Sequence, residues 1–215
     1  MARTRPRPLD RMPARPRPHR APAPRPERAR HGDIVSAAIA VFFRYGLRRV
    51  TMEDVAREAG VSRQTVYARF GNKERLFVAA ASHMLDQSNA GARAALDAPG
   101  ALWDRVLAAF EAQNVGHVRD LQRSEYAEEL WGTVSTLLAP IVAAKERRMV
   151  AAIAAAVERA RADGEVRLAP GVTPRELAET MVLADAGFKS HDVTVPKYRA
   201  RLRVLVELMR QATRA

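Results

Sequence analysis

The sequence contains no cysteine, and aromatic side chains make up only 6% of its 215 residues. A chain without cysteine forms no disulfide and no thiolate metal site, which fits a reducing cytoplasm. No apolar run approaches the ~18–20 residues that a membrane helix needs, and the basic N-terminus lacks the apolar segment of a secretory signal. We therefore expect a folded protein of the cytoplasm with no membrane partner.

Signals of catalysis and of metal binding are also missing. The chain has no glycine-rich phosphate loop, and Ser190, His191 and Asp192 are sequence neighbours, whereas the members of a catalytic triad come from separate segments. The histidines show no metal-ligand spacing; they are His19, His31, His83, His117 and His191. We expect no enzyme, no catalytic residue, no metal site and no cofactor.

What the chain has in excess is positive charge near its N-terminus. The formal net charge is +12, and residues 1–31 contribute ten arginines against Asp10 and Glu27. The same segment holds eight of the thirteen prolines, which favours an extended, disordered arm. Such an arm is suited to DNA phosphates or a minor groove. A plain solvated tail, or translation that starts at Met12, is the alternative explanation.

From Asp33 onward the apolar spacing is helical, and the sequence predicts an all-α fold. Prolines fit the first turns of three helices, at positions 140, 174 and 196, and Gly46, Gly60 and Gly164 fit helix ends. The expected helices are 33–46, 51–59, 63–69, 73–94, 100–117, 120–136, 141–163, 174–190 and 196–213.

The first three helices have the plan of a helix-turn-helix. The first places Ile34, Ala37, Ala38, Val41, Phe42 and Tyr45 on one face. Thr51 and Ser62 are good N-caps for the second and third helices, and Gly60 suits the turn between them. The third helix has one inward aliphatic residue, Val66, whereas its other faces offer hydrogen-bonding groups that suit bases and phosphates.

Residues 51–74, TMEDVAREAGVSRQTVYARFGNKE, resemble the signature of the tetracycline-repressor (TetR) family. The resemblance extends over about residues 31–80 and implies a three-helix DNA-binding head, followed by a body of about six helices. The expected domains are a 1–31 arm, a 32–80 DNA-binding head, and an 81–215 ligand-binding and dimerisation body. The family acts as homodimers on palindromic operators and mostly represses, so the expected location is the bacterial cytoplasm, at the nucleoid.

The resemblance also assigns roles within the head. Thr51, Thr65, Tyr67 and Lys73 match phosphate-contacting positions, while Arg63, Gln64 and Ala68 match base-facing positions and Arg69 lies at the groove edge. Ala68 offers only a methyl group. Each role has a structural alternative: Thr51 is a cap in any case, Tyr67 could be half-buried packing, and Lys73 could be an ordinary solvated lysine. Val55, Val61, Val66 and Phe70 match the head core.

The body is almost neutral and rich in alanine. Its last two helices carry apolar positions that either pair across a two-fold axis or fill the protomer's own core; they are Leu177, Met181, Val182, Ala186, Leu202, Val206, Leu208 and Met209. Candidate pocket residues are the large side chains of the middle helices, each of which also suits plain core: Trp103, Phe110, His117, Tyr126, Trp131, Met149, Met181 and Phe188. Glu125, Glu128 and Glu129 are an alternative set for a cationic ligand.

These patterns predict a homodimeric repressor that a small apolar or amphipathic inducer releases from double-stranded operator DNA. Two alternatives stay open. One is a regulator or activator that needs no ligand. The other is a non-specific nucleic-acid binder that acts through the basic arm.

Overall fold

The computed structural model describes residues 31–214. The predicted N-terminal arm therefore lies outside the described residues, except for His31, with which the first helix begins. Within the described range the chain is all-α, as the sequence predicts, and no strand occurs there. None of the helices of residues 31–214 is both long and apolar enough to cross a membrane.

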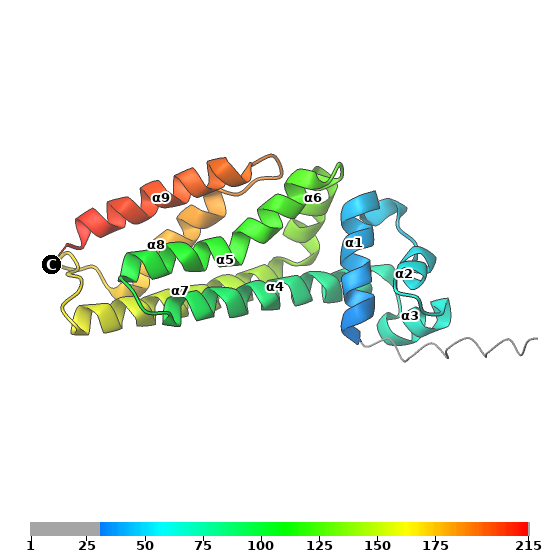
Figure 1. The fold of residues 1–215 in the computed structure, drawn as a ribbon, viewed down its shortest axis with the longest axis horizontal. Helices are drawn as coiled ribbons and strands as arrows, with labels where there is room; N and C mark the ends of the chain where they lie inside the picture. Colours follow the sequence, from blue (N-terminus) through cyan, green and yellow to red (C-terminus); the bar gives the residue numbers. More distant parts are fainter. Residues whose placement is uncertain (1–30, 215) are drawn as a thin grey trace, which may run out of the picture.

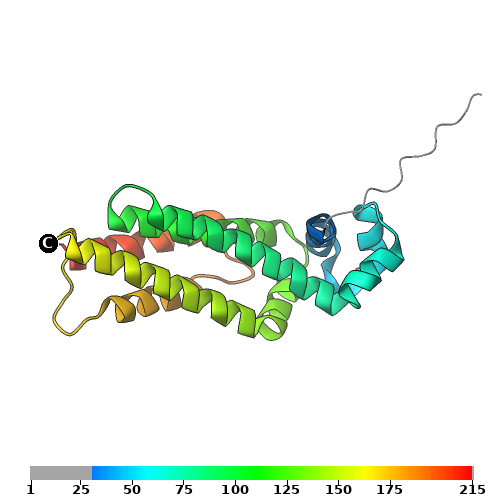
Figure 2. The ribbon, with the colours of Figure 1, turned by 90° about the horizontal axis from the view of Figure 1, so that it is seen from below.

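Nine helices make up the described part of the chain (Figure 1). In order they are α1 His31–Arg49, α2 Met52–Glu58, α3 Arg63–Phe70, α4 Lys73–Asp97, α5 Leu102–Arg123, α6 Ala127–Leu137, α7 Ala139–Ala162, α8 Pro174–Gly187 and α9 Val195–Ala212. Helices α1 to α3 form a head at one end of an elongated molecule, and the chain ends at the opposite end. Helix α4 leaves the head and runs beside α7 along the body, as both views show (Figure 2).

The ends of the head helices follow the local chemistry of the sequence. Thr51 accepts a hydrogen bond from the backbone N–H of Asp54, whose carboxylate accepts one from the backbone N–H of Thr51 in return, which is a capping box. Ser62 caps α3 in the predicted way. Gly46 and Gly60 have φ angles of 73° and 65°, which only glycine adopts readily, so both end helical turns where expected.

The boundary between α5 and α6 was predicted wrongly. The sequence favoured helices over 100–117 and 120–136, yet α5 continues to Arg123 and α6 begins at Ala127. The break is fixed at Ser124, whose hydroxyl donates a 2.7 Å hydrogen bond to the carbonyl oxygen of Phe43 in α1. A contact across 81 residues leaves no periodic trace in the local sequence.

Two separate hydrophobic cores hold the fold together. The head core contains the expected Val55, Val66 and Phe70, and it also takes in Leu130 and Leu138 from α6 and its end. Tyr45 was expected on the buried face of α1 but is 47% exposed. The second core fills the body between α5, α7, α8 and α9. Helix α4 contributes to both cores, so it joins the two parts mechanically.

Candidate functional site

Helix α3 lies on the outside of the head with most of its polar side chains in solvent. Val66 and Phe70 are buried and hold the helix against the head core. Of the residues predicted to contact DNA, Gln64, Ala68 and Arg69 are exposed, and Tyr67 is 38% exposed. Thr65 is half-buried, with its hydroxyl 2.8 Å from that of Ser62. Thr51 is exposed at the start of α2.

The side chain of Arg63 is folded back along the head. Its guanidinium forms an ion pair with Glu53 of α2 and donates a 3.4 Å hydrogen bond to the hydroxyl of Tyr67. It also lies 5.0 Å from the centre of the Tyr67 ring, within the range of a cation–π contact. The Tyr67 hydroxyl and the Glu53 carboxylate hold the pKa of Arg63 above its ordinary value. Arg63 is therefore charged and already has partners before it meets any ligand.

Lys73 opens α4 beside the exposed face of α3. It is half-buried, and its Nζ donates a 3.2 Å hydrogen bond to the carbonyl oxygen of Arg48 at the end of α1. A lysine ammonium has three donors, so this bond leaves two for an anion at the N-terminus of α4. The same bond ties the start of α4 to the end of α1.

The end of α1 is held by the segment that links α5 to α6, and we call this contact the clasp: Ser124, Tyr126 and Glu129 against residues 43–49. Glu129 accepts a 2.7 Å hydrogen bond from the backbone N–H of Arg48, and the Tyr126 hydroxyl accepts a 2.9 Å one from Arg49. A Cβ atom on Gly46 would lie 2.8 Å from the Tyr126 ring. Only glycine fits there, so the clasp is closely packed.

A cavity of about 180 Å³ lies between the head and the body. Its wall is mostly apolar and comes from five helices and the residue two places after α8; it consists of Ile39, Phe42, Phe43, Phe77, Ala80, Ala81, Met84, Leu85, Asn114, His117, Leu121, Leu130, Trp131, Val134, Leu138, Val142, Lys145 and Lys189. Phe42 and Phe77 meet edge to face, with ring centres 5.3 Å apart. The cavity therefore borders directly on the head core.

Four polar residues lie in this otherwise apolar wall: Asn114, His117, Lys145 and Lys189. Behind them Asp185, which is buried, accepts hydrogen bonds from Tyr198 (2.5 Å), Lys189 (2.7 Å) and Asn114 (3.1 Å). Lys145 is 8% exposed and donates a 3.3 Å hydrogen bond to Asn114 Oδ1. All of these residues except His117 are thus joined in one hydrogen-bonded network that lies against the cavity.

Burial shapes the protonation of this cluster. It lowers the pKa of His117 to about 3, and the positive charges of Lys145 and Lys189 add to the effect. Burial also lowers the pKa of Lys145 to about 7, with a further contribution from Lys189. Burial and the nearby Asp185 carboxylate raise the pKa of Tyr198, so its hydroxyl stays protonated.

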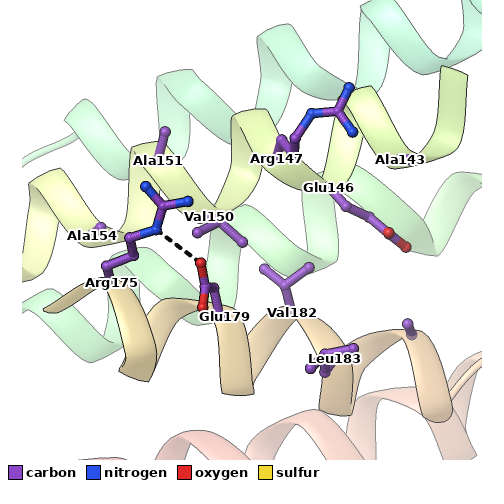
Figure 3. A pocket seen from close by; sticks show the side chains of 11 residues that line it. Ala143, Glu146, Arg147, Val150, Ala151, Ala154, Arg175, Glu179, Val182 and Leu183 are labelled. Atoms are coloured by element: carbon purple, nitrogen blue, oxygen red, sulfur yellow. Dashed lines mark hydrogen bonds and ion pairs between the residues drawn. The ribbon is translucent and has the colours of Figure 1, made fainter. Parts of the chain in front are cut away.

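Two larger hollows lie on the body. One of about 530 Å³ lies between α7 and α8, where Arg175 and Glu179 form a 2.9 Å ion pair across one turn of α8 (Figure 3). Its floor is made of small apolar residues such as Val150 and Ala154, and the 74% exposed Leu183 stands at its edge. Another, of about 420 Å³, lies between α4, α5 and α7. The lining of this second hollow includes the buried Gln113, which donates a 3.0 Å hydrogen bond to Asn89, but neither hollow is lined by a buried lysine.

Residues 34–80 match the family described as bacterial regulatory proteins, tetR family. The head, residues 34–80, is therefore of the tetR type. It is 30% identical over 92 residues to YezE, an uncharacterised helix-turn-helix-type transcriptional regulator of Bacillus subtilis; the match covers 43% of this chain and 47% of that one. The chain thus spans about half the length of this curated relative.

Solved structures extend the likeness of fold to most of the chain. A transcriptional regulator from Cytophaga hutchinsonii superposes with a TM-score of 0.69 at 17% identity, over 85% of this chain and 97% of that one. SmeT, the repressor of the Stenotrophomonas maltophilia multidrug efflux pump SmeDEF, superposes with a TM-score of 0.62 at 20% identity, over 88% and 93%. The body therefore has the fold found in tetR-family structures.

Two of the residues expected to line a pocket in the body do line the inner cavity, His117 and Trp131. Tyr126 belongs to the clasp, and the remaining five pack in or against the body core: Trp103, Phe110, Met149, Met181 and Phe188. Sequence reasoning missed the polar residues Asn114, Lys145 and Lys189. They come from three separate segments, and only the fold brings them together.

Proposed function

We propose that this protein is a homodimeric, DNA-binding transcription regulator that reads DNA with α3. The observation that carries the proposal is the composition of α3: two buried apolar residues anchor it, and Arg63, Gln64, Tyr67 and Arg69 are left in solvent. Arginine and glutamine pair with guanine and adenine edges in the major groove. Tyrosine, threonine and lysine at the rim suit phosphates.

Within this proposal the eight head residues divide into two groups. Arg63, Gln64 and Ala68 face the bases, with Arg69 at the edge of the groove. Thr51, Thr65, Tyr67 and Lys73 contact phosphates. The position of Lys73 at the first turn of α4 supports this assignment, because the free N–H groups of a helix start favour an anion.

A dimer would place two copies of α3 about one turn of DNA apart, roughly 34–36 Å. Helices α8 and α9 carry exposed apolar side chains that support pairing there: Leu183 is 74%, Val204 61% and Leu208 59% exposed. Of the apolar positions for which the sequence allowed either an interface or the protomer's own core, four lie inside the protomer, namely Met181, Val182, Leu202 and Val206. The helical spacing of these residues therefore identifies the faces of α8 and α9 that pack inside the protomer.

We further propose that a small molecule in the inner cavity releases the protein from a repressed operator. The cavity touches α1 of the head, α4, which connects the head to the body, and α6 of the body, and α6 carries Glu129 of the clasp. A ligand that displaces α6 therefore strains the clasp and the bond between Lys73 and Arg48. Release requires that the ligand bind the DNA-incompetent arrangement more tightly. One solved structure of SmeT is a complex with triclosan, which supports ligand binding in this fold.

The test is equilibrium binding to an inverted repeat from the upstream region of the gene and to a random duplex of equal length. Arg63→Ala should lower the preference for the specific duplex by about 1–3 kcal/mol, whereas Lys73→Ala should weaken both complexes and reduce the salt dependence. Arg175→Ala, in the body, serves as the control for loss of one positive charge.

Equal losses on both duplexes for Arg63→Ala would contradict base reading by α3. Removal of residues 1–30 distinguishes the proposal from a non-specific binder that acts through the basic arm. Under the proposal, binding to the specific duplex should survive the deletion. A regulator that needs no ligand would keep its affinity for DNA when the cavity is filled.

A further inference from the structure

The polar end of the inner cavity has an unbalanced positive charge. The only carboxylate of this cluster, Asp185, already holds Lys189 at 2.7 Å and accepts hydrogen bonds from Tyr198 and Asn114. Lys145 lies beside it with a single neutral hydrogen-bond partner, Asn114, and forms no ion pair within residues 31–214. A buried ammonium without a counterion is costly, and a bound anion would offset that cost.

His117 supplies a second observation. Its Nε2 atom is buried and has no hydrogen-bond partner among the described residues, although the ring lines the cavity. Burial, together with the positive charges of the two lysines, lowers the pKa of His117 to about 3, so the ring stays neutral and retains one N–H donor. Buried polar atoms are nearly always paired, and an unpaired one beside a cavity indicates a missing partner.

The rest of the wall fixes the other half of the ligand. Away from the polar end it is formed by apolar side chains such as Phe43, Phe77 and Trp131. The volume of about 180 Å³ is smaller than the ~300–1,000 Å³ typical of drug-sized ligands. The acidic residues that would have favoured a cation lie elsewhere: Glu125 and Glu128 are exposed, and Glu129 is engaged in the clasp.

We propose that the inner cavity binds a compact amphipathic carboxylate, with the carboxylate held by Lys145, Lys189 and His117 and the apolar part against the head core. Binding itself does not depend on the proposed regulatory function. The further step, that this anion is the inducer, does rest on it. A cationic ligand would be repelled by the ammonium of Lys145 at the same place, and a neutral alcohol would supply no counterion for that ammonium.

Three probes with the same alkyl chain test the sign of the charge: octanoate, 1-octanol and octylamine. Calorimetric titration of the full chain should show octanoate binding about tenfold or more tightly than octanol, and octylamine weakest. Lys145→Met should abolish this preference while leaving the affinity for octanol unchanged or higher. Lys197→Met, which removes an exposed lysine at the start of α9, should behave as the wild type.

Proton uptake gives an independent readout. An anion beside Lys145 raises its pKa, so octanoate binding near pH 7.5 should take up protons, measured as a dependence of the binding enthalpy on the buffer. The uptake should disappear in Lys145→Met. His117→Phe, which removes the two ring nitrogens and keeps an aromatic ring at this position, should weaken octanoate binding and spare octanol binding.

Equal affinity for the three probes, or a preference for octanoate that survives in Lys145→Met, would overturn the proposal. A separate arm adds octanoate to the protein–DNA complex. Octanoate that binds without releasing DNA would refute its role as inducer and leave the site standing. Failure of the protein to bind any DNA would refute the proposed function and leave the titrations unaffected.

Discussion

The head carries its polar groups on its surface, whereas the body buries several of them. In the head the buried residues are apolar, and the chemistry lies outside, on α3 and the first turn of α4. In the body several charged or polar side chains are buried, among them Asn114, Lys145 and Asp185. Burial of such groups costs free energy unless each is paired. This difference is what the proposed division of roles requires, with DNA bound on the surface of the head and a ligand bound inside the body.

Among the tests of this comparison, removal of the buried carboxylate of Asp185 is expected to change the free energy of unfolding most. Asp185→Ala leaves the ammonium of Lys189, the Tyr198 hydroxyl and one donor of Asn114 without their acceptor. Breaking one side of a buried pair costs about 3–5 kcal/mol. Urea unfolding monitored by circular dichroism should show a loss of that size.

The matched control is Glu179→Ala on the same helix. Glu179 also pairs with a basic side chain, Arg175, but both are largely exposed, so its removal should cost less than about 1 kcal/mol. Similar losses for the two variants would mean that the polar network in the body contributes no more than a surface ion pair. The contrast between the two parts of the molecule would then lose its energetic basis.

A second prediction concerns the pH dependence of stability. The pKa of Lys145 is lowered from 10.5 to about 7, mainly by burial and then by Lys189, while Asp185 and Glu146 partly oppose the shift. Between these two values the unfolded chain binds more protons than the folded one. The free energy of unfolding contributed by Lys145 therefore rises with pH across this window, and the penalty is fully present below about pH 7.

Lys145→Met removes that penalty, so it should stabilise the protein more at pH 6 than at pH 9. The measurement is the free energy of unfolding of wild type and variant at pH 6, 7.5 and 9. Lys197→Met replaces an exposed lysine, so the difference between its free energy of unfolding and that of the wild type should not change with pH. A constant difference for Lys145→Met as well would show that water reaches its ammonium freely.

The head was predictable from sequence because its determinants are local. Thr51, Ser62 and Gly60 act within a few residues of their own positions, and the apolar spacing of α1 identified most of its buried face. Tyr45 was the exception, because the end of that helix turns its side chain into solvent. Each of these signals needs only the neighbouring turn.

The body was predictable only as a set of helices. The break after α5 depends on the bond from Ser124 to Phe43, and the polar end of the cavity depends on residues as far apart as Asn114 and Lys189. The local sequence around Lys145 does not show that its side chain is buried, because the helices that cover it come from other parts of the chain. The stripes on α8 and α9 were recognised correctly as apolar, but the sequence left open which partner covers them.

The smallest expected effect lies on the outer face of the head. Arg63 must leave Glu53 and Tyr67 before it can reach a base, so these contacts compete with DNA. Glu53→Gln removes the ion pair and should raise the affinity for the specific duplex by up to about fivefold, since exposed pairs contribute ~0.2–1 kcal/mol.

Removal of any acidic residue near DNA also raises the affinity for DNA by reducing charge repulsion, and that part of the gain must be subtracted. Glu58→Gln provides the correction, because Glu58 lies on the same helix and pairs with Arg44 at 3.6 Å. The gain of Glu53→Gln over Glu58→Gln measures the release of Arg63, and it should vanish in an Arg63→Ala background. Equal gains for the two variants would mean that Arg63 leaves Glu53 and Tyr67 at no cost in binding free energy. The contacts that Arg63 makes in the free protein would then not compete with DNA.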